Sequence, residues 1–261
     1  RNAVAPGSTV ATFVPVNFAP VRRWHRSGIG MVSMHPSKDP ISRPAFGRSR
    51  LNRKQTLGLL EHFVAGTPAR TAADLIGIHR NSATLFFHRL REVITARLAQ
   101  SSGSNPESAR EVEIGVHVFG RAVVFRAVHN ASGKATVIGL LQRGGHIQAV
   151  VLPDGRRDTL LSILRDQLDA GAVVYADRPD IDDALNALGI CHYGIDRGAR
   201  GSAAHAHISG LENFWSQAER SLRQYNGIPA HRFALFLKEC EWRFNCRTPK
   251  QRLATLEEWI D

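Results

Sequence analysis

The sequence predicts an N-terminal all-α domain followed by an α/β domain in which helices flank a mixed β-sheet. The chain has 261 residues, of which 43% are hydrophobic, enough for a packed core in one large or two modest domains. From residue 52 to residue 98, apolar residues recur at helical spacing. After residue 110, short runs rich in Val and Ile are followed by helical patterns, which is typical of a sheet covered by helices.

Residues 1–50 are predicted to form a flexible basic arm. They contain six prolines and scattered arginines without a sustained period, a composition that does not support a long helix. At most a short strand is expected at residues 9–16. The chain begins with Arg rather than Met, so Met31 and Met34 are alternative starts, and it stays open whether the arm is native coding sequence.

Residues 51–98 are predicted to form a helix-turn-helix DNA-binding domain. A helical stripe ends at Gly66, a short second helix spans residues 69–76, Gly77 lies in a tight turn, and a third helix spans residues 80–98. The N-terminal end of the third helix should present base-reading side chains, and arginines farther along should reach phosphates. The predicted DNA-binding residues are His79, Arg80, Asn81, Ser82, Thr84, Arg89 and Arg91. The core should include Ile78, Leu85 and Phe86.

A plain three-helix bundle with a solvated basic face is the structural alternative. The formal net charge of +11 and the pI near 10.5 favour DNA binding, because such a field attracts a polyanion. An anionic membrane surface would also be attracted, but no run of about 18 apolar residues could span a bilayer, and no signal peptide is recognisable. We therefore expect a cytoplasmic protein associated with the nucleoid.

The three cysteines lack the paired C-x-x-C spacing of zinc ribbons and redox motifs, which fits a reducing cytoplasm. A zinc site formed by His192, His205 and His207 is the less favoured interpretation of these histidines. No cysteine pair accompanies them, so solvated or DNA-facing side chains are favoured.

Residues 99–110 are predicted to be a Ser-, Gly- and Asn-rich linker, and residues 111–261 to form the α/β domain. Strands are expected at residues 111–119, 122–128 (pairing with the first), 136–142, 146–152, 172–176 and 190–195. Helices are expected at residues 158–168, 181–188, 210–225, 229–245 and 251–259. The strand at residues 172–176 is short and wholly apolar, as central strands are. It delivers Asp177 at its carboxyl end, where ligands bind in open α/β sheets.

Glu212 stands near the start of a helix whose apolar positions predict a buried face. The predicted elements are several strands, a helix, a strand that ends in Asp, and then a helix that bears Glu. This is the element order of an RNase H-like fold. Hard divalent cations choose oxygen ligands, and two Mg²⁺ ions about 3.5–4 Å apart can stabilise both the attacking and the leaving oxygen in phosphoryl transfer. Asp177 and Glu212 are therefore the candidate acids. A structural ion pair or cap is the alternative for Glu212.

Separated motifs resemble the ISXO2-like DDE transposases, small bacterial insertion-sequence enzymes related to the eukaryotic Merlin elements. The likeness runs colinearly from about residue 51 to the C-terminus. It is carried by residues 64–66, 71–73, 87–91, 139–145, 174–177, 207–215, 225–229 and 237–245.

The resemblance implies an insertion-sequence transposase that binds terminal inverted repeats and catalyses DNA cleavage and strand transfer. It implies double-stranded DNA of the element ends and the target as partner, and a homo-oligomer assembled on that DNA. It further implies that Asp177 and Glu212 are the second and third catalytic acids and bind Mg²⁺ (or Mn²⁺).

The first acid of the family pattern is missing, because Gly115 stands where the resemblance places a catalytic Asp. Glu113 faces the same side of the strand but is about 6.6 Å away along it, so it is at best a weak substitute. Glu219 stands where a Lys is expected, Ser209 where Asn is usual, and the sequence diverges over residues 114–132. The activity of this copy is therefore expected to be impaired.

Two other functions stay open. A non-catalytic DNA-binding relic or repressor of related elements would retain the scaffold without the chemistry. An RNase H-like protein acting on RNA is favoured if the N-terminal helices show no preference for duplex DNA.

Overall fold

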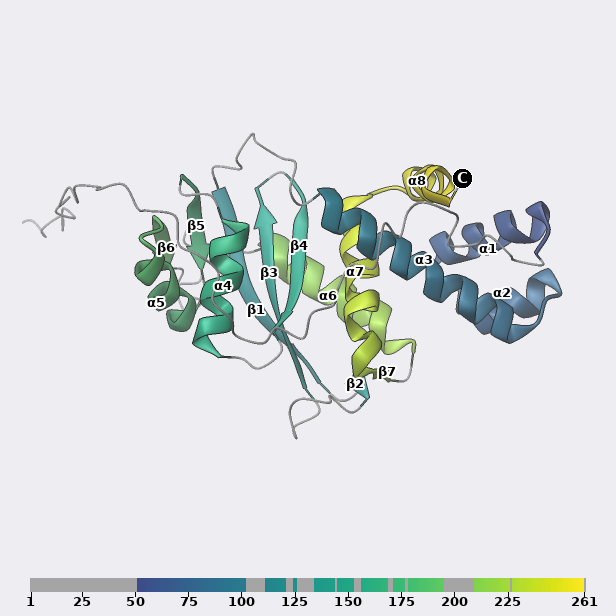
Figure 1. Cartoon of the computed structure of the whole chain (residues 1–261), viewed down its shortest axis with the longest axis horizontal. Helices are drawn as coiled ribbons and strands as arrows, with labels where there is room; N and C mark the ends of the chain where they lie inside the picture. The colour runs from purple at the N-terminus through teal and green to yellow at the C-terminus, as the bar shows by residue number, and fades with distance from the viewer. Residues whose placement is uncertain are drawn as a thin grey trace, which may run out of the picture. The chain divides into compact units, whose positions relative to one another are not determined.

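The computed structural model describes residues 51–101, 111–120, 124–125, 134–143, 145–152, 156–168, 171–176, 178–194, 209–225 and 227–260 (Figure 1). The predicted arm at residues 1–50 lies outside this part of the chain. So do most of the predicted linker, Asp177, His205 and His207.

Three helices open the described chain: α1 (Arg53–Ala65), α2 (Ala69–Ile76) and α3 (Arg80–Ser101). Asn52 begins α1 with a capping box, in which the Gln55 N–H donates to the Asn52 side chain at 2.9 Å and the Asn52 N–H donates to the Gln55 side chain at 3.0 Å. Gly66 and Gly77 end α1 and α2 in the left-handed conformation, at φ of 77° and 75°. The predicted stops of both helices are confirmed, whereas α3 continues to Ser101, into the predicted linker.

The core of these three helices is shared with the C-terminal helices α7 (Ala230–Asn245) and α8 (Pro249–Ile260). Trp242 of α7 is 1% exposed and packs with Phe63 of α1, their ring centroids 6.2 Å apart. Phe86 is buried as expected, but the expectation for Leu85 was wrong, because Leu85 is 50% exposed on the outer face of α3. The three helices therefore do not form a core of their own.

A five-stranded mixed sheet forms the second part of the described chain. Its order is β4 (Ile147–Leu152), β3 (Ala135–Gln142), β1 (Glu111–Phe119), β5 (Val173–Ala176) and β6 (His192–Gly194). The β1/β3 and β3/β4 pairs are antiparallel, and the β1/β5 and β5/β6 pairs are parallel. This RNase H-like arrangement confirms the predicted fold class.

Helices cover both faces of the sheet (Figure 1). On one face, α4 (Arg157–Gln167) and α5 (Pro179–Leu188) share a core with β1, β3 and β5. On the other face, α6 (Ser209–Arg223) and α7 share a core with β1, β3 and β4. No helix among the described residues is long and apolar enough to cross a membrane.

One predicted strand pairing was wrong. The strand expected at residues 122–128 was assigned to the first strand, but its described part, β2 (Val124–Phe125), pairs in parallel with β7 (Ile228–Pro229). Alternation of apolar residues identifies a strand but not its partner, and this partner lies about a hundred residues away.

Side chains of α7 cover the free edge of β4. The Glu241 carboxylate accepts the Ala149 N–H at 2.9 Å, and the Asn245 amide accepts from the Ile147 N–H at 2.9 Å and donates to the Ile147 carbonyl at 3.0 Å. These contacts satisfy backbone groups that an edge strand otherwise offers to another chain. They also fix α7 against the sheet.

A glycine on β3 permits the close approach of α6. A Cβ added at Gly139 would lie 2.7 Å from Trp215 Cζ2 and 2.9 Å from Leu211 Cδ2, closer than a real Cβ can approach. Gly139 is the register partner of Gly115 on β1. The head of α6, which carries Glu212, therefore packs directly over the middle of β1 and β3.

Candidate active site

The candidate site begins on the α6 side of β1. Successive side chains of a strand alternate between faces, so residues 113, 115, 117 and 119 share one face. Phe119 on this face is fully buried in the core that includes Trp215 of α6. Gly115 therefore lies on the α6 side of the sheet.

The strand register supports the placement of the first acid position. Ile114 of β1 and Ala176 of β5 are partners in the parallel pair. The next residues in the chain are Gly115 and Asp177, which the family resemblance leads us to expect at the positions of the first and second acids. Asp177 itself lies outside the described residues.

Glu212 lies in the first turn of α6 and its side chain is exposed. Its neighbour Leu211 is fully buried against the sheet, and this burial fixes the rotation of the helix. A carboxylate in the first turn is stabilised by the helix dipole. Glu212 is thus held on a rigid element and open to solvent, as a ligand for a cation has to be.

Glu113 is buried beneath the head of α6 and is only 5% exposed. The Leu211 N–H donates to its carboxylate, but within the described part of the chain the Oε2 atom has no hydrogen-bond partner. A Cβ added at Gly210 would lie 2.3 Å from Leu141 Cδ2 and 3.3 Å from this Oε2, so Gly210 permits the head of α6 to pack closely over both side chains. Burial raises the pKa of Glu113 to about 7, and the Leu211 hydrogen bond and the charge of Arg143 only partly oppose this rise.

These carboxylates do not by themselves complete a metal site. No group of three or more His, Cys, Asp or Glu that could hold a metal occurs among the described residues. The unpaired Oε2 of Glu113 has the right chemistry for a hard cation. However, a metal ligand has to be deprotonated, which the raised pKa of Glu113 opposes, and Gly115 supplies no oxygen.

Glu219, where the resemblance leads us to expect a Lys, is paired with other side chains. His117 Nε2 lies 3.0 Å from Glu219 Oε1, and Arg223 donates to Glu219 Oε2 at 2.8 Å. The His117 ring stacks on Trp215 with centroids 5.1 Å apart and an interplanar angle of 14°. This local cluster joins β1 to α6 and presents no unpaired basic group.

Most of the predicted DNA-binding residues lie at the N-terminal end of α3 and are exposed: His79, Arg80, Asn81, Ser82 and Thr84. The Arg80 guanidinium is held by Asp74 through two contacts of 3.1 Å, and Thr84 donates to the Arg80 carbonyl at 2.9 Å. Arg89 is half-buried. His79, Asn81 and Ser82 are therefore exposed at this end of α3, whereas Arg80 is already paired with Asp74, and a role of these residues in binding DNA is a proposal.

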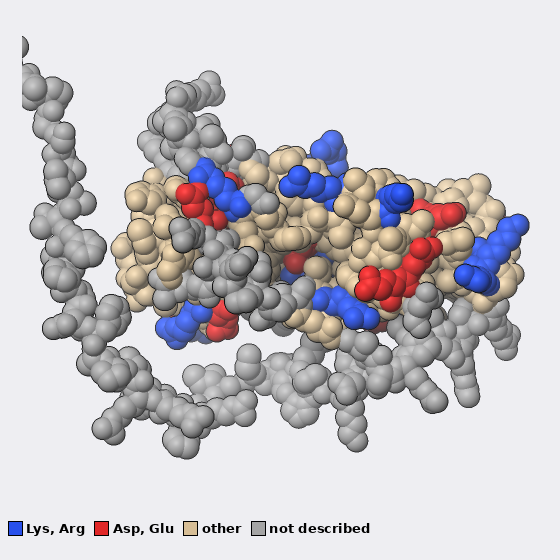
Figure 2. Space-filling model, turned by 90° about the horizontal axis from the view of Figure 1, so that it is seen from above, with Lys and Arg blue, Asp and Glu red and all other residues tan. Residues whose placement is uncertain are grey.

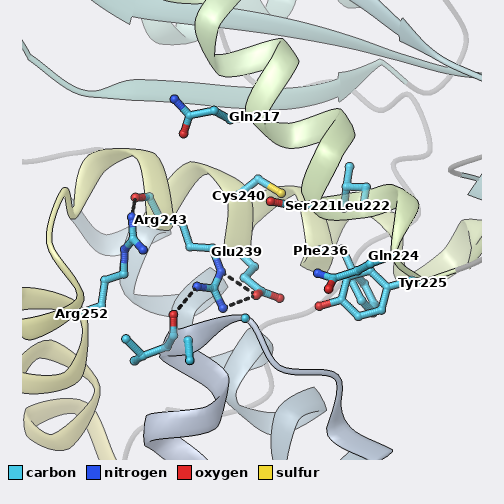
Figure 3. Close-up of a pocket in the computed structure, with 13 residues that line it drawn as sticks. Gln217, Ser221, Leu222, Gln224, Tyr225, Phe236, Glu239, Cys240, Arg243 and Arg252 are labelled. Atoms are coloured by element: carbon cyan, nitrogen blue, oxygen red, sulfur yellow. Dashed lines mark hydrogen bonds and ion pairs between the residues drawn. The ribbon is translucent and has the colours of Figure 1, made fainter. Parts of the chain in front are cut away.

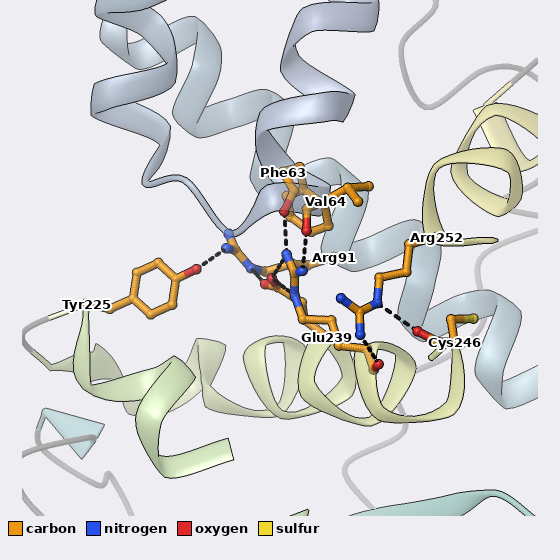
Figure 4. A network of polar contacts seen from close by, with 8 residues as sticks. Phe63, Val64, Arg91, Tyr225, Glu239, Cys246 and Arg252 are labelled. Atoms are coloured by element: carbon orange, nitrogen blue, oxygen red, sulfur yellow. Dashed lines mark hydrogen bonds and ion pairs between the residues drawn. The ribbon is translucent and has the colours of Figure 1, made fainter. Parts of the chain in front are cut away.

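Arg91 requires a correction. It is only 5% exposed, its Nε donates to Glu239 at 2.6 Å, its Nη2 donates to the Tyr225 hydroxyl at 3.2 Å, and its Cζ lies 3.9 Å from the Phe236 ring centroid (Figure 4). A guanidinium held inside the protein in this way cannot reach a phosphate. Its partners are more than 130 residues away along the chain, so helical position alone could not reveal them.

Arg91 belongs to a buried cluster that joins α1, α3 and α7. Arg243 Nε donates to the second oxygen of Glu239 at 2.8 Å, and the same guanidinium donates to the carbonyls of Val64 and Phe63 at the end of α1 (Figure 4). Burial alone would raise the pKa of Glu239, but the charges of Arg91 and Arg243 and their hydrogen bonds hold it below its ordinary value. Glu239 is therefore an anion that stabilises the contact between the helices.

A cavity of about 240 Å³ lies beside this cluster, between the end of α1 and helices α6 and α7 (Figure 3). Its polar lining includes Gln217, Tyr225, Glu239, Arg243 and Arg252. The Arg252 guanidinium is bonded to the carbonyls of Cys246 at 2.7 Å and Arg243 at 2.6 Å. Neither Gly115 nor Glu212 lines this cavity, so it is separate from the candidate active site.

Sequence comparisons identify relatives of this chain. The ISXO2-like transposase domain matches residues 114–245. An uncharacterized transposase-like protein of Haemophilus influenzae is 36% identical over 114 residues, which are 44% of this chain and 93% of that protein.

Similarity to solved structures is distant. The pre-cleavage Mos1 transpososome matches with a TM-score of 0.34 and 11% identity over 82% of this chain and 80% of that chain. The catalytic domain of Mos1 mariner transposase matches with a TM-score of 0.30 and 11% identity over 67% and 93% of the two chains. The family assignment rests instead on the sequence matches, because the domain match spans half of the chain. The chain belongs to the ISXO2-like family of DDE transposases of insertion-sequence type.

Proposed function

We propose that this chain is an insertion-sequence transposase that recognises the terminal inverted repeats of its element but is impaired in cutting and joining DNA. The observation that carries the proposal is Gly115, in the middle of β1 and on the side covered by α6. No carboxylate is available at the position where the family pattern has its first catalytic Asp. The rest of the fold that would support the site is present.

The proposed ligands for Mg²⁺ or Mn²⁺ are Asp177 and Glu212. A bound pair of such ions would supply the charge that stabilises the attacking and leaving oxygens of the phosphate. Glu212 is open to solvent on a rigid helix, whereas Glu113 is buried, bonded to the Leu211 N–H and close to half-protonated at neutral pH. Glu113 is therefore a poor replacement for the missing ligand, and loss of metal positioning removes most of the catalysis.

Recognition of DNA is assigned to α1, α2 and α3 as a helix-turn-helix. In support, the short α2, the turn at Gly77 and the exposed polar end of α3 have the layout of this motif. A transposase acts on two DNA ends, so the active assembly is proposed to be a homo-oligomer.

A cleavage assay tests this proposal. The purified full-length chain is incubated with duplexes that carry the ends of its element, in Mg²⁺ and in Mn²⁺. The expected result is cleavage near background for the natural chain and a gain on the order of 100-fold for Gly115→Asp. Gly115→Asn is the matched control, because it adds a side chain of the same size without the charge. If the natural chain cleaves the duplex as fast as Gly115→Asp does, the proposed impairment is contradicted.

The second candidate function is a non-catalytic protein that occupies the terminal repeats and represses related elements. The same glycine favours it, since the exposed end of α3 does not depend on the missing acid. Metal-dependent cleavage separates the two functions, whereas repeat binding does not. A preference for RNA over duplex DNA would instead favour the third possibility, an RNase H-like protein acting on RNA.

A further inference from the structure

Two tyrosines form a stacked pair on the sheet beside the candidate active site. Tyr175 of β5 and Tyr193 of β6 are register partners, with ring centroids 5.6 Å apart and an interplanar angle of 22°. Tyr175 is also the register partner of Glu113 on β1. The three residues therefore form one cross-strand row on the α6 side of the sheet, two residues before the position of Gly115.

The outer ring of this pair is accessible. Tyr193 is 57% exposed, while Tyr175 is half-buried against the core beneath α6. The helices that cover β5 and β6 in the described chain, α4 and α5, lie on the opposite face. The row thus ends in an aromatic ring that is backed by a second ring and is open on its outer side.

A basic group completes this cluster. The Arg143 guanidinium carbon lies 5.4 Å from the Tyr175 ring centroid, and Arg143 is ion-paired with Glu111. Because Glu111 balances the charge of Arg143, the cluster offers ring surface for stacking rather than a site for a phosphate. Such a surface fits the face of a planar nucleobase, and base–aromatic stacking is the usual way in which single-stranded nucleic acid is held.

We propose that Tyr193, backed by Tyr175, is a stacking platform for an unpaired nucleobase at the DNA end that lies in the candidate active site. Stacking suits this position because every base has a π-face, so the platform need not depend on sequence. It would hold an end whose strands have separated near Gly115. This inference rests on the proposed function for its partner, DNA, but not on the helix-turn-helix or on catalysis.

Binding measurements with the full-length chain test the platform. The probes are a short blunt duplex with the terminal-repeat sequence, the same duplex with a short single-stranded overhang, both duplexes with a scrambled sequence, and the overhang strand alone. Tyr193→Ala should weaken binding of the overhang duplex by about 5- to 150-fold and leave binding of the blunt duplex unchanged. Tyr193→Phe keeps the ring and should bind like the natural chain. Val118→Ala, which truncates an exposed apolar side chain on β1, is the control and should have no effect.

Photo-crosslinking gives a second readout. An overhang that carries 5-iodouracil should crosslink to Tyr193, identified by mass spectrometry of the peptides. Equal affinity of Tyr193→Ala and the natural chain for the overhang duplex overturns the platform. A change in oligomeric state of Tyr193→Ala without DNA also overturns it, because Tyr193 would then contact a second copy of the chain.

The results separate this inference from the proposed function. If the chain binds the terminal repeats specifically and Tyr193→Ala does not change the affinity for the overhang duplex, the platform is overturned and the proposed function is not. Tyr193-dependent binding of the overhang without any preference for the repeats supports the platform and overturns the proposed recognition. Binding of none of the probes overturns both.

Discussion

The helical region at residues 51–98 and the sheet region at residues 99–261 differ in charge. The first holds seven basic residues (Lys and Arg) and three acidic residues (Asp and Glu). The second holds nineteen basic and nineteen acidic residues. Residues 1–50 add eight basic residues and one acidic residue. The whole formal net charge of +11 therefore comes from residues 1–98. Figure 2 shows one face of the described chain, on which basic and acidic side chains are interspersed. Long-range attraction of DNA is therefore expected from the N-terminal part of the chain.

The two regions also differ in what they retain of the family pattern. The exposed end of α3 offers the polar side chains that recognition requires. The sheet has the expected topology and carries Glu212 at the start of α6, but Gly115 stands where the resemblance leads us to expect the first acid. The proposed loss of chemistry therefore need not affect the proposed recognition, although the two regions share a core and the buried Glu239 cluster.

The largest expected effect comes from breaking the link between the regions. Glu239→Gln leaves Arg91 and Arg243 buried beside a neutral amide, so the free energy of unfolding should fall by about 3–5 kcal/mol. Urea denaturation measures this change. Glu61→Gln, at an exposed site on α1, is the control and should stay within about 0.5 kcal/mol. A small effect of Glu239→Gln would mean that the regions are held together by the apolar core alone.

Within the sheet region, Gly139→Ala should destabilise the protein by about 1–3 kcal/mol, because the new Cβ would overlap Trp215 and Leu211 and push α6 away from β3. Gly171→Ala is the matched control, since a Cβ there meets nothing within 4 Å. Thermal or urea unfolding of both variants checks the difference. Equal stabilities would show that α6 does not depend on this close approach.

The charge difference between the regions can be tested by salt dependence. Arg89→Ala on α3 should weaken duplex DNA binding for all sequences and lower the slope of log affinity against log salt by about one. Arg165→Ala, at an exposed site on α4, should leave the slope unchanged. If Arg165→Ala changes the slope more than Arg89→Ala does, the sheet region rather than α3 contacts the DNA phosphates.

The smallest expected effect concerns Glu113 and pH. The pKa of Glu113 is raised from 4.5 to about 7 in the folded protein, so the protonated form stabilises the fold. Its contribution is fully present below about pH 4.5 and is lost as the pH rises through about 7. Between pH 5 and 7, the free energy of unfolding should therefore fall by about 1 kcal/mol less in Glu113→Gln than in the natural chain. Identical pH profiles would contradict the burial of this carboxyl group.

Local patterns predicted much of the fold. Gly66 and Gly77 mark helix ends through their own conformation, and apolar runs located every strand of the sheet to within a few residues. Contacts between distant segments could not be predicted in this way. Helical spacing placed Leu85 in the core and Arg91 on the surface, because it cannot show that α7 covers the side of α3 that carries Arg91.

The candidate site was predicted unevenly. Family motifs pointed to Gly115 and Glu212, and the structure places both on the α6 side of the sheet. The stacking of Tyr175 on Tyr193 depends on strand register, which no local motif in either segment reveals. The pairing of His117 with Glu219 likewise needed the packing of α6 on β1.

Direct binding of Mn²⁺ tests the central claim, that the chain has lost its first metal ligand at Gly115. Titration calorimetry compares the natural chain with Gly115→Asp and with Gly115→Asn as the uncharged control. We predict weak binding by the natural chain and by Gly115→Asn, and binding tighter by about tenfold or more for Gly115→Asp. Tight Mn²⁺ binding by the natural chain that Glu113→Gln abolishes would contradict the account, because Glu113 would then supply the missing ligand.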